Sequence, residues 1–343
     1  MRLRFSLAAL ALLGSCTSGE PASAPLSQTP SSTEAMLAAG EWLHWGGGPE
    51  ATRYSPLTQI AAANVGQLEI AWRWSADTSG APESANFKST PIFDDGVLYV
   101  PWLEHGAAAI DAGTGETLWT FAPPSGFGGR APNLGPRSLA YWTDGTTKRL
   151  LHNSMDGRLI AIDARTGQLS PGFGRDGVID LREGVVERHP VTDVASVSPA
   201  LVVGDIVVAQ VTVPGARNKE SAPGYIRAFD VRTGALVWTW NPIPQAGEFG
   251  AETWEDGSNA YSGAAGAWSM LSADPERGLI YVPHETPTNE FYGGHRLGDN
   301  LFSDSLVCLD AKTGKRVWHF QVVHHDLWDY DLPSAPILHD LVK

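Results

Sequence analysis

Hydrophobic and polar residues alternate in short runs along the chain, and four of these runs are followed by the same short sequence pattern. The four stretches are "AAAIDAGTGETLW" (107–119), "LIAIDARTGQL" (159–169), "IRAFDVRTGALVW" (226–238) and "LVCLDAKTGKRVW" (306–318). Each carries an Asp followed by Thr-Gly, and three of them end in a Trp where the second has Pro171. Alternation with a period of two predicts strands, and Thr-Gly supplies the positive-φ residue of the turn between them.

Each repeat therefore predicts a hairpin whose Asp caps the turn and whose Trp packs between neighbouring units. A further apolar run precedes each hairpin, for example at 89–101 and 198–210, so a unit has about four strands. Repeats of this kind are typical of β-propeller blades, and the uneven spacing of the repeats indicates long insertions. Cys308 takes the place of a small Ala in the other three repeats, which predicts a buried core residue.

Composition excludes two classes of protein. The 343 residues are 43% hydrophobic and carry a formal net charge of −14, with no basic stretch, so we expect no nucleic-acid partner. The sequence contains no CxxCH motif, so the chain holds no c-type haem of its own.

The N-terminus, "MRLRFSLAALALLGSC", has two arginines followed by a short apolar run, which is typical of an export signal. Residues 13–16 resemble a bacterial lipobox, so Cys16 is the predicted lipidation site, with an ordinary cleaved signal as the alternative. We expect a signal peptide at 1–16, a flexible tether at 17–40 and a partial propeller at 41–343. The predicted location is the periplasmic face of a bacterial membrane, lipid-anchored; the alternative is a soluble periplasmic or secreted protein.

The four repeats resemble the tryptophan-docking motif of quinoprotein dehydrogenases, eight-bladed propellers that bind pyrroloquinoline quinone (PQQ). Segments 42–74, 157–184 and 287–333 extend the resemblance, and the last two look like the quinoprotein glucose dehydrogenase branch. The resemblance implies an all-β fold, with this chain as the N-terminal half of an eight-bladed ring. It also implies oxidation of a sugar or alcohol hydroxyl, with electrons passing to a cytochrome c or ubiquinone of the respiratory chain.

The segment "HHDLWDYDLPSAP" (324–336) is the candidate for catalysis, because it combines acids with aromatic residues. Oxidation of a hydroxyl needs a base within hydrogen-bond reach of its proton. The resemblance places this base at Asp329, after the Trp of an Asp-x-Trp-Asp segment, with Asp326 as the second candidate. The alternative is that these acids only cap turns.

The resemblance also assigns cofactor contacts. Trp268 matches the indole that stacks beneath the quinone, Arg137 and Ser196 match residues beside it, and Ser154 is a weaker candidate. Arg158, near Ser154, is also a weaker candidate for a cofactor contact; the alternative is that it pairs with Asp156 and holds the end of a strand.

Calcium bridges quinone and protein in the alcohol-oxidising relatives, so the resemblance implies Ca²⁺, with Asp329 and Thr286 as candidate ligands. The relatives' Glu and Asn ligands fall near Pro214 and at Thr286, which are departures from the family pattern. Lys88 replaces an acid near the quinone. Because Ca²⁺ prefers six to eight oxygens, Glu220 and Glu285 are further candidates.

Two other classes of function compete with the enzyme. One is a non-catalytic propeller lipoprotein that acts as a protein-binding scaffold, as in outer-membrane assembly, and the other is a secreted glycan-binding propeller. Neither needs a base opposite an aromatic floor, so Trp268 together with residues 324–331 favours the dehydrogenase.

Overall fold

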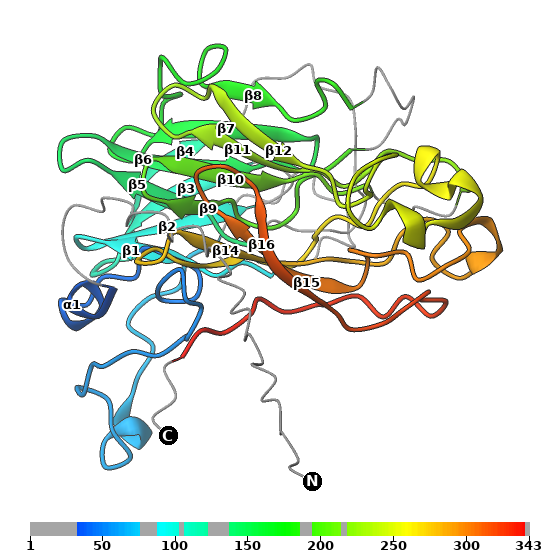
Figure 1. Cartoon of the computed structure of the whole chain (residues 1–343). Coiled ribbons are helices and arrows are strands. Elements are labelled where there is room, and N and C mark those ends of the chain that lie inside the picture. Colours follow the sequence, from blue (N-terminus) through cyan, green and yellow to red (C-terminus); the bar gives the residue numbers. More distant parts are fainter. Residues whose placement is uncertain are drawn as a thin grey trace, which may run out of the picture.

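The computed structural model contains four antiparallel sheets of four strands each within the part of the chain that it describes (Figure 1). That part comprises residues 33–75, 88–102, 106–122, 137–185, 194–213 and 218–339. The predicted signal peptide with Cys16, and Pro214, lie outside these residues. No helix among the described residues has the length and apolar character needed to cross a membrane.

Each sheet is one blade, built from strands that follow one another in the chain. Blade 1 contains β1 (Ile92–Asp94), β2 (Val97–Trp102), β3 (Gly106–Asp111) and β4 (Thr117–Phe121). Blade 2 contains β5 (Ala140–Thr143), β6 (Lys148–Asn153), β7 (Arg158–Asp163) and β8 (Val178–Asp180). Blade 3 contains β9 (Leu201–Val203), β10 (Ile206–Gln210), β11 (Ile226–Asp230) and β12 (Leu236–Trp240). Blade 4 contains β13 (Ser272–Asp274), β14 (Leu279–Pro283), β15 (Ser305–Asp310) and β16 (Arg316–Gln321).

Helical structure is short and lies between the blades or before them. It comprises α1 (Thr33–Ala38) and the 3₁₀ helices η1 (Val65–Gln67), η2 (Ala251–Thr253), η3 (Glu255–Ala260) and η4 (Gly293–His295). Helix α1 falls inside the predicted tether, and its Leu37 is buried. Residues Thr33–Ala38 are therefore part of the folded protein and not of a flexible tether, because the Leu37 side chain is buried.

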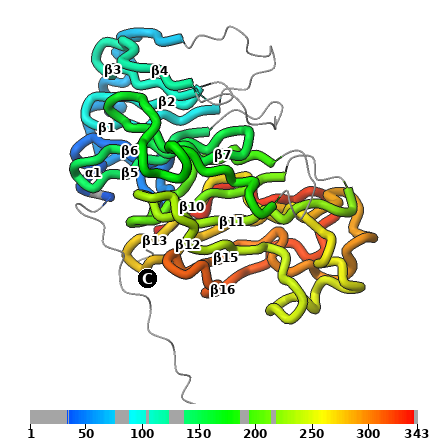
Figure 2. The backbone as a smooth tube through the Cα atoms, turned by 90° about the horizontal axis from the view of Figure 1, so that it is seen from above, coloured from blue at the N-terminus to red at the C-terminus, as the bar shows by residue number. Residues whose placement is uncertain are grey.

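The blades follow one another in chain order, as Figure 2 shows. The first strands of blades 2, 3 and 4 lie side by side, as expected for strands nearest the axis of a propeller. Three large clusters of buried apolar side chains join blade 1 to 2, blade 2 to 3 and blade 3 to 4. The core therefore lies between blades, so each blade depends on its neighbours for burial of its faces. The predicted propeller blades are confirmed.

The Asp of each repeat caps its turn as predicted. In blade 1, Asp111 Oδ1 accepts from the backbone N–H groups of Gly113 and Thr114 at 3.0 and 2.8 Å. The same bonds recur at Asp163, Asp230 and Asp310. The Gly of each Thr-Gly has a positive φ, between 67° and 76°.

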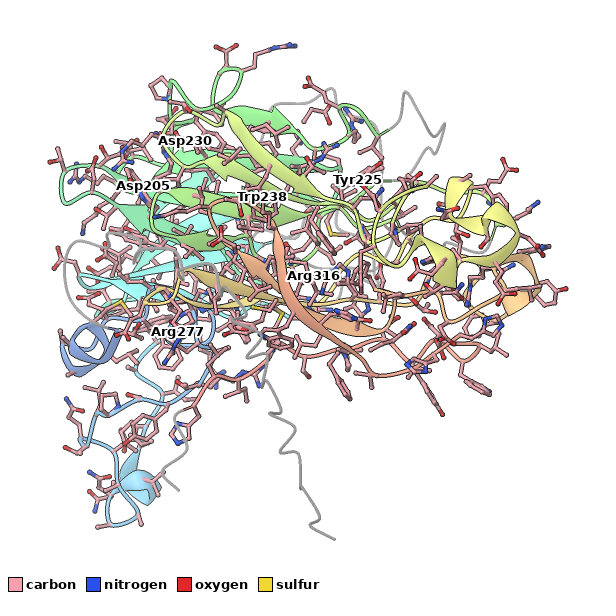
Figure 3. The ribbon with its side chains drawn as sticks, viewed as in Figure 1. Asp205, Tyr225, Asp230, Trp238, Arg277 and Arg316 are labelled. Atoms are coloured by element: carbon pink, nitrogen blue, oxygen red, sulfur yellow. The ribbon has the colours of Figure 1, made fainter. Side chains whose placement is uncertain are left out.

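The Trp of one repeat docks on the Thr-Gly turn of the next blade. Trp119 Nε1 donates to the carbonyl of Ala164 at 3.1 Å, and Trp238 Nε1 donates to that of Ala311 at 2.8 Å. A Cβ on the Gly of the receiving turn would lie 2.6 Å from the indole ring in both cases. Figure 3 labels Trp238, on the outer strand of blade 3. The predicted packing of Trp between units is confirmed.

Blade 2 has no docking Trp, and an arginine makes the equivalent bond. Arg149 Nη1 donates to the carbonyl of Val231, which occupies the same place in its repeat as Ala164 and Ala311. The Arg149 guanidinium also bonds the Arg232 carbonyl at 2.9 Å and lies 5.5 Å from the centre of the Phe173 ring. A cation over aromatic rings thus replaces the indole at the seam between blades 2 and 3.

Replacing Arg149 with Met is expected to lower the free energy of unfolding by about 2–3 kcal/mol, because buried carbonyls lose a charged donor. Urea unfolding measures the effect. The matched control is Arg165→Met, which removes an exposed arginine of the same blade and should change stability by less than about 0.5 kcal/mol. Equal losses for the two variants would show that Arg149 does not hold the seam.

Cys308 is fully buried, as predicted. It lies opposite Trp318 in the sheet, at the position of a register shift that also occurs at Ala109 and Ala228. Burial raises the pKa of the Cys308 thiol to about 12, which is consistent with a core residue rather than a reactive one.

Candidate active site

Trp268 lies in the segment that leads from η3 into β13, and its indole is partly buried. It packs against Met155, Ala195 and Val197, which come from the two preceding blades. Its backbone carbonyl accepts a hydrogen bond from Ser198 Oγ at 2.5 Å. The position of the ring is therefore set by blades 2 and 3 as well as by its own segment.

Asp331 fixes the edge of the same indole. Trp268 Nε1 donates to Asp331 Oδ2 at 2.6 Å, and the backbone N–H of Thr286 donates to Asp331 Oδ1 at 2.8 Å. Burial raises the pKa of this carboxyl to about 6; the two hydrogen bonds lower it, and the charges of Asp329 and Asp326 raise it further. The sequence prediction missed this residue, although the third acid of residues 324–336 was visible there.

Asp326, the second candidate base, is completely buried and caps a turn. Its two carboxylate oxygens accept from the backbone N–H groups of Trp328 and Tyr330, at 3.1 and 2.9 Å. The structure therefore gives Asp326 the turn-capping role that the sequence left as the alternative. Asp329 is exposed and has a φ of 63°, so the turn presents its side chain toward solvent. Its assignment as the base stays a prediction.

Arg137 and Trp268, which the resemblance assigned to one site, lie together. The Arg137 Cζ atom is 5.0 Å from the centre of the Trp268 ring, a cation–π contact. Burial lowers the pKa of the Arg137 guanidinium, yet an arginine remains charged at neutral pH. A positive charge over an indole face is a suitable place for a flat anionic ring.

The two candidate serines are hydrogen-bonded within the protein. Ser196 Oγ donates to the Gln210 carbonyl at 2.7 Å. Ser154 Oγ donates to Asp156, whose carboxylate also accepts from Arg158 Nε at 2.8 Å. Both hydroxyls are thus used in holding strand ends, and the alternative reading of Arg158 as the partner of Asp156 is confirmed.

The described residues offer few ligands for a metal ion. Thr286 Oγ1 is buried with no hydrogen-bond partner, which suits a ligand atom, and Asp331 is bonded to the backbone of the same residue. Glu285 is buried but its Oε1 accepts from the Gly266 N–H at 3.1 Å, and burial raises its pKa well above the usual range. No group of three or more His, Cys, Asp or Glu in this part of the chain converges to hold a metal. Lys88 and Glu220 are exposed.

Asp304 is a further buried acid near this site, besides Asp326 and Glu285. Neither carboxylate oxygen has a hydrogen-bond donor in the structure, and the neighbouring Ser303 hydroxyl donates to the Asn300 carbonyl at 2.6 Å. Burial raises the pKa of Asp304 to about 8; the charges of Asp326 and Asp331 raise it further, and the Arg296 guanidinium lowers it. The raised pKa favours the protonated form of Asp304 at neutral pH.

A cavity of about 1010 Å³ lies elsewhere, between blades 2 and 3. Its walls come from β8, from the loop before it and from β11 and β12, and they include none of the predicted site residues. The short β8 leaves this face of blade 3 uncovered. The cavity belongs to the seam that Arg149 closes and not to the Trp268 site.

Fold and site together define a β-propeller whose blades are linked by two docked tryptophans and one arginine, and which contains an indole fixed by a carboxylate and contacted by a second arginine. Residues 42–343 match the family model described as "Glucose/ethanol/alcohol dehydrogenase, beta-propeller domain" of the PQQ enzymes. The chain belongs to this family.

Curated relatives agree with the family. The chain is 32% identical over 330 residues to a quinoprotein glucose dehydrogenase of Gluconobacter oxydans, covering 89% of this chain and 40% of the relative. It is 31% identical over 319 residues to a glycerol dehydrogenase large subunit of the same organism, covering 90% and 42%. The chain therefore spans about two fifths of the length of these relatives.

A solved structure matches the fold. The quinohemoprotein alcohol dehydrogenase from Comamonas testosteroni superposes with a TM-score of 0.73 at 28% identity, over 88% of this chain and 45% of that one. This partial coverage is consistent with the prediction that the chain corresponds to the N-terminal half of a propeller.

Proposed function

We propose that this chain is the N-terminal part of a PQQ-dependent dehydrogenase that oxidises a hydroxyl of a sugar or an alcohol. The observation that carries the proposal is the Trp268 indole held at its edge by Asp331 and faced by Arg137. Family membership supports it, because the relatives are named as glucose, glycerol and alcohol dehydrogenases. The N-terminal sequence supports export and lipidation at Cys16, and hence electron transfer to a periplasmic or membrane acceptor.

In this proposal PQQ would be held by Trp268 and Arg137 and would supply the two-electron oxidant that takes up the hydride of the carbon bearing the hydroxyl. Trp268 supplies the flat floor, and the Asp331 carboxylate keeps the indole from turning because it accepts the Nε1–H. Arg137 supplies positive charge to the carboxylates of the cofactor. Asp329 takes the hydroxyl proton of the substrate as general base.

The proposed Ca²⁺ would bind Thr286 Oγ1, the buried oxygen that lacks a partner. The Asp331 carboxylate lies next to it through the Thr286 N–H, and Asp329 is the third candidate. Since Ca²⁺ takes about six to eight oxygens, most of the shell must come from cofactor, water or residues outside the described part.

Dye reduction tests the proposed function. The full-length gene product is loaded with PQQ and Ca²⁺ and assayed with glucose, other aldoses and simple alcohols. Reduction of the dye with at least one of these substrates is the expected result. A protein that binds the quinone and reduces no dye with any of them would not be a dehydrogenase of this class.

A further inference from the structure

Arg296 is completely buried, although an arginine stays charged at neutral pH. It follows η4 in the loop between β14 and β15. Its Nη1 donates to Asn300 Oδ1 at 2.8 Å, and its Nη2 donates to the carbonyls of Asn289 and Asp326 at 3.2 and 2.5 Å. Burial lowers the pKa of the guanidinium, and the charges of Asp304 and Asp326 raise it. This buried charge therefore joins its own loop to a segment 30 residues further along the chain.

Asn300 sets the direction of the Arg296 side chain. Asn300 Nδ2 donates back to the Arg296 carbonyl at 2.8 Å, so the two fully buried residues hold each other. The planar guanidinium then reaches the Asn300 oxygen and two carbonyls at once. A lysine ammonium on its flexible stem cannot make these bonds with the same geometry.

The Asp326 carbonyl belongs to the turn at residues 326–331, here called the acidic turn, which carries the proposed base. The residue before this turn, His325, is bonded to the same loop: its Nδ1 and its backbone N–H donate to two successive carbonyls, at 2.8 and 3.2 Å. In the described part of the chain, the hydrogen bonds of His325 and Asp326 to other segments all end on residues 296–299. The loop of Arg296 therefore holds the start of the acidic turn.

A glycine lets the acidic turn approach this loop. Gly293 begins η4, and a Cβ there would lie 2.4 Å from His325 Nε2 and 2.5 Å from Leu327 Cδ2. Any other residue at this position would push the turn away, so the close approach of the two segments depends on the missing side chain.

The loop of Arg296 is itself supported by the segment between β12 and β13. The Glu255 N–H donates to the Leu297 carbonyl at 2.9 Å, and Tyr261 Oη donates to the His295 carbonyl at 2.5 Å. Figure 1 shows the two segments, in yellow and orange, side by side, and Figure 2 shows the same arrangement from above. The acidic turn thus rests on a loop that is bonded on its other side to the protein.

We propose that Arg296 is a positioning residue, which fixes the acidic turn by holding the Asp326 carbonyl. The position of this turn decides two contacts: that of Asp329 with the substrate hydroxyl, and that of Asp331 with Trp268. Both contacts depend steeply on distance, since a displacement of about 1 Å can cost roughly 10²-fold in rate. This inference rests on the proposed function and adds a residue to the same site.

Amide hydrogen exchange on the full-length gene product, without PQQ, tests whether Arg296 holds the acidic turn. The amides of Trp328 and Tyr330 donate to the Asp326 carboxylate. In Arg296→Met we expect these amides to exchange at least about 10-fold faster than in the wild type, because the turn opens more often. Arg296→Lys should give an intermediate rate, since an ammonium replaces only some of the bonds.

Arg149→Met is the matched control, because it also removes a buried arginine bonded to two backbone carbonyls, but at the seam between blades 2 and 3. It should leave exchange in the acidic turn within about twofold of the wild type. If Arg296→Met does not fold, Arg296→Lys is compared with Arg149→Lys. Equal exchange of the acidic turn in the Arg296 variant and its control overturns the proposal.

Steady-state dye reduction by the PQQ-loaded protein tests whether this position matters for the reaction. In Arg296→Lys we expect kcat to fall about 5- to 50-fold and the affinity for PQQ to fall about 3- to 10-fold, because Asp329 and Asp331 move together. Asp329→Asn lowers kcat alone, so the joint loss distinguishes the two variants. Arg149→Met should change neither quantity, as expected for a purely structural arginine.

Faster exchange of the acidic turn with kcat and quinone affinity both unchanged would show that Arg296 only stabilises the fold, and would overturn the positioning role. A wild type that binds the quinone and reduces no dye would instead contradict the proposed dehydrogenase. In that case exchange and quinone affinity, which need no turnover, still decide the role of Arg296.

Discussion

Replacing Asp329 with Asn in the full-length protein is expected to lower kcat by about 10²–10⁴-fold, while the affinity for PQQ stays within about threefold. The physical reason is that an amide cannot accept the hydroxyl proton. The affinity for PQQ should change little because the Asp329 side chain is exposed and the edge of the Trp268 indole is held by Asp331 instead. Steady-state dye reduction measures kcat, and the absorbance of bound quinone measures affinity.

Two neighbouring acids are the controls for that result, because each has a different predicted effect. In Asp331→Asn, the side-chain NH₂ replaces one of the two accepting oxygens and so faces either the Thr286 N–H or the Trp268 Nε1–H, donor against donor. The edge of the Trp268 indole is then no longer fixed, and PQQ should bind about 5- to 100-fold more weakly. In Asp326→Asn, the buried turn is disturbed and stability should fall, with kcat changed less than in Asp329→Asn. Loss of turnover with intact quinone binding in Asp326→Asn or Asp331→Asn, but not in Asp329→Asn, would identify a different base.

The contribution of Asp304 to the free energy of unfolding is expected to fall as pH rises from about 4 to about 8, and Asp304→Asn is expected to remove this contribution. His44 and His284, whose pKa values burial lowers to about 3 and about 4, act with the opposite sign up to about pH 6.5, so the difference between variant and wild type is the quantity to measure. Burial raises the pKa of Asp304 from 3.8 to about 8 in the folded chain, so the folded state binds a proton that the unfolded state has lost. Stability from this group is complete below pH 3.8 and is lost as pH rises toward its folded pKa, at roughly 1.4 kcal/mol per pH unit. Asp331 and Glu285, also raised by burial, act with the same sign.

Urea unfolding at several pH values measures this dependence for the wild type and for two variants. The stability of Asp304→Asn relative to that of the wild type should increase as pH rises, because a neutral amide has no proton to lose. Asp256→Asn, which changes an exposed acid, should leave the slope as it is. A wild-type slope that survives in Asp304→Asn would mean that Asp304 is already ionised in the fold.

The repeats predicted the blades because their signals are local. Asp caps a turn two and three residues away, and Thr-Gly sets the backbone there, so sequence spacing is enough. The contact that Arg149 makes between blades 2 and 3 was not predicted, and the reason is different. Pro171 stands where Trp was expected, and the replacing side chain, Arg149, comes from an earlier strand of the blade. Nothing in the spacing of the repeat points to it.

The site was predicted in part for a similar reason. Motif matching found Trp268 and Arg137, which do lie together, because each stands in a recognisable segment. Motif matching did not assign the correct role to each of the three acids in residues 326–331, since those roles depend on the direction in which the turn points each side chain. Asp326 points to the backbone, Asp329 to solvent and Asp331 to Trp268, and only the folded turn decides this.

The glycines of the Thr-Gly turns restrict how the sequences of neighbouring blades can change during evolution. An isolated turn with positive φ tolerates Asn, so replacement there would ordinarily be mild. At Gly167 and Gly314, however, any β-carbon would collide with the indole docked from the preceding blade, and at Gly115 it would collide with the indole of Trp72. Gly234 meets the backbone of Gly174 instead. The amino acid at each of these turns is therefore dictated by the neighbour, and two adjoining units must change together when either one drifts.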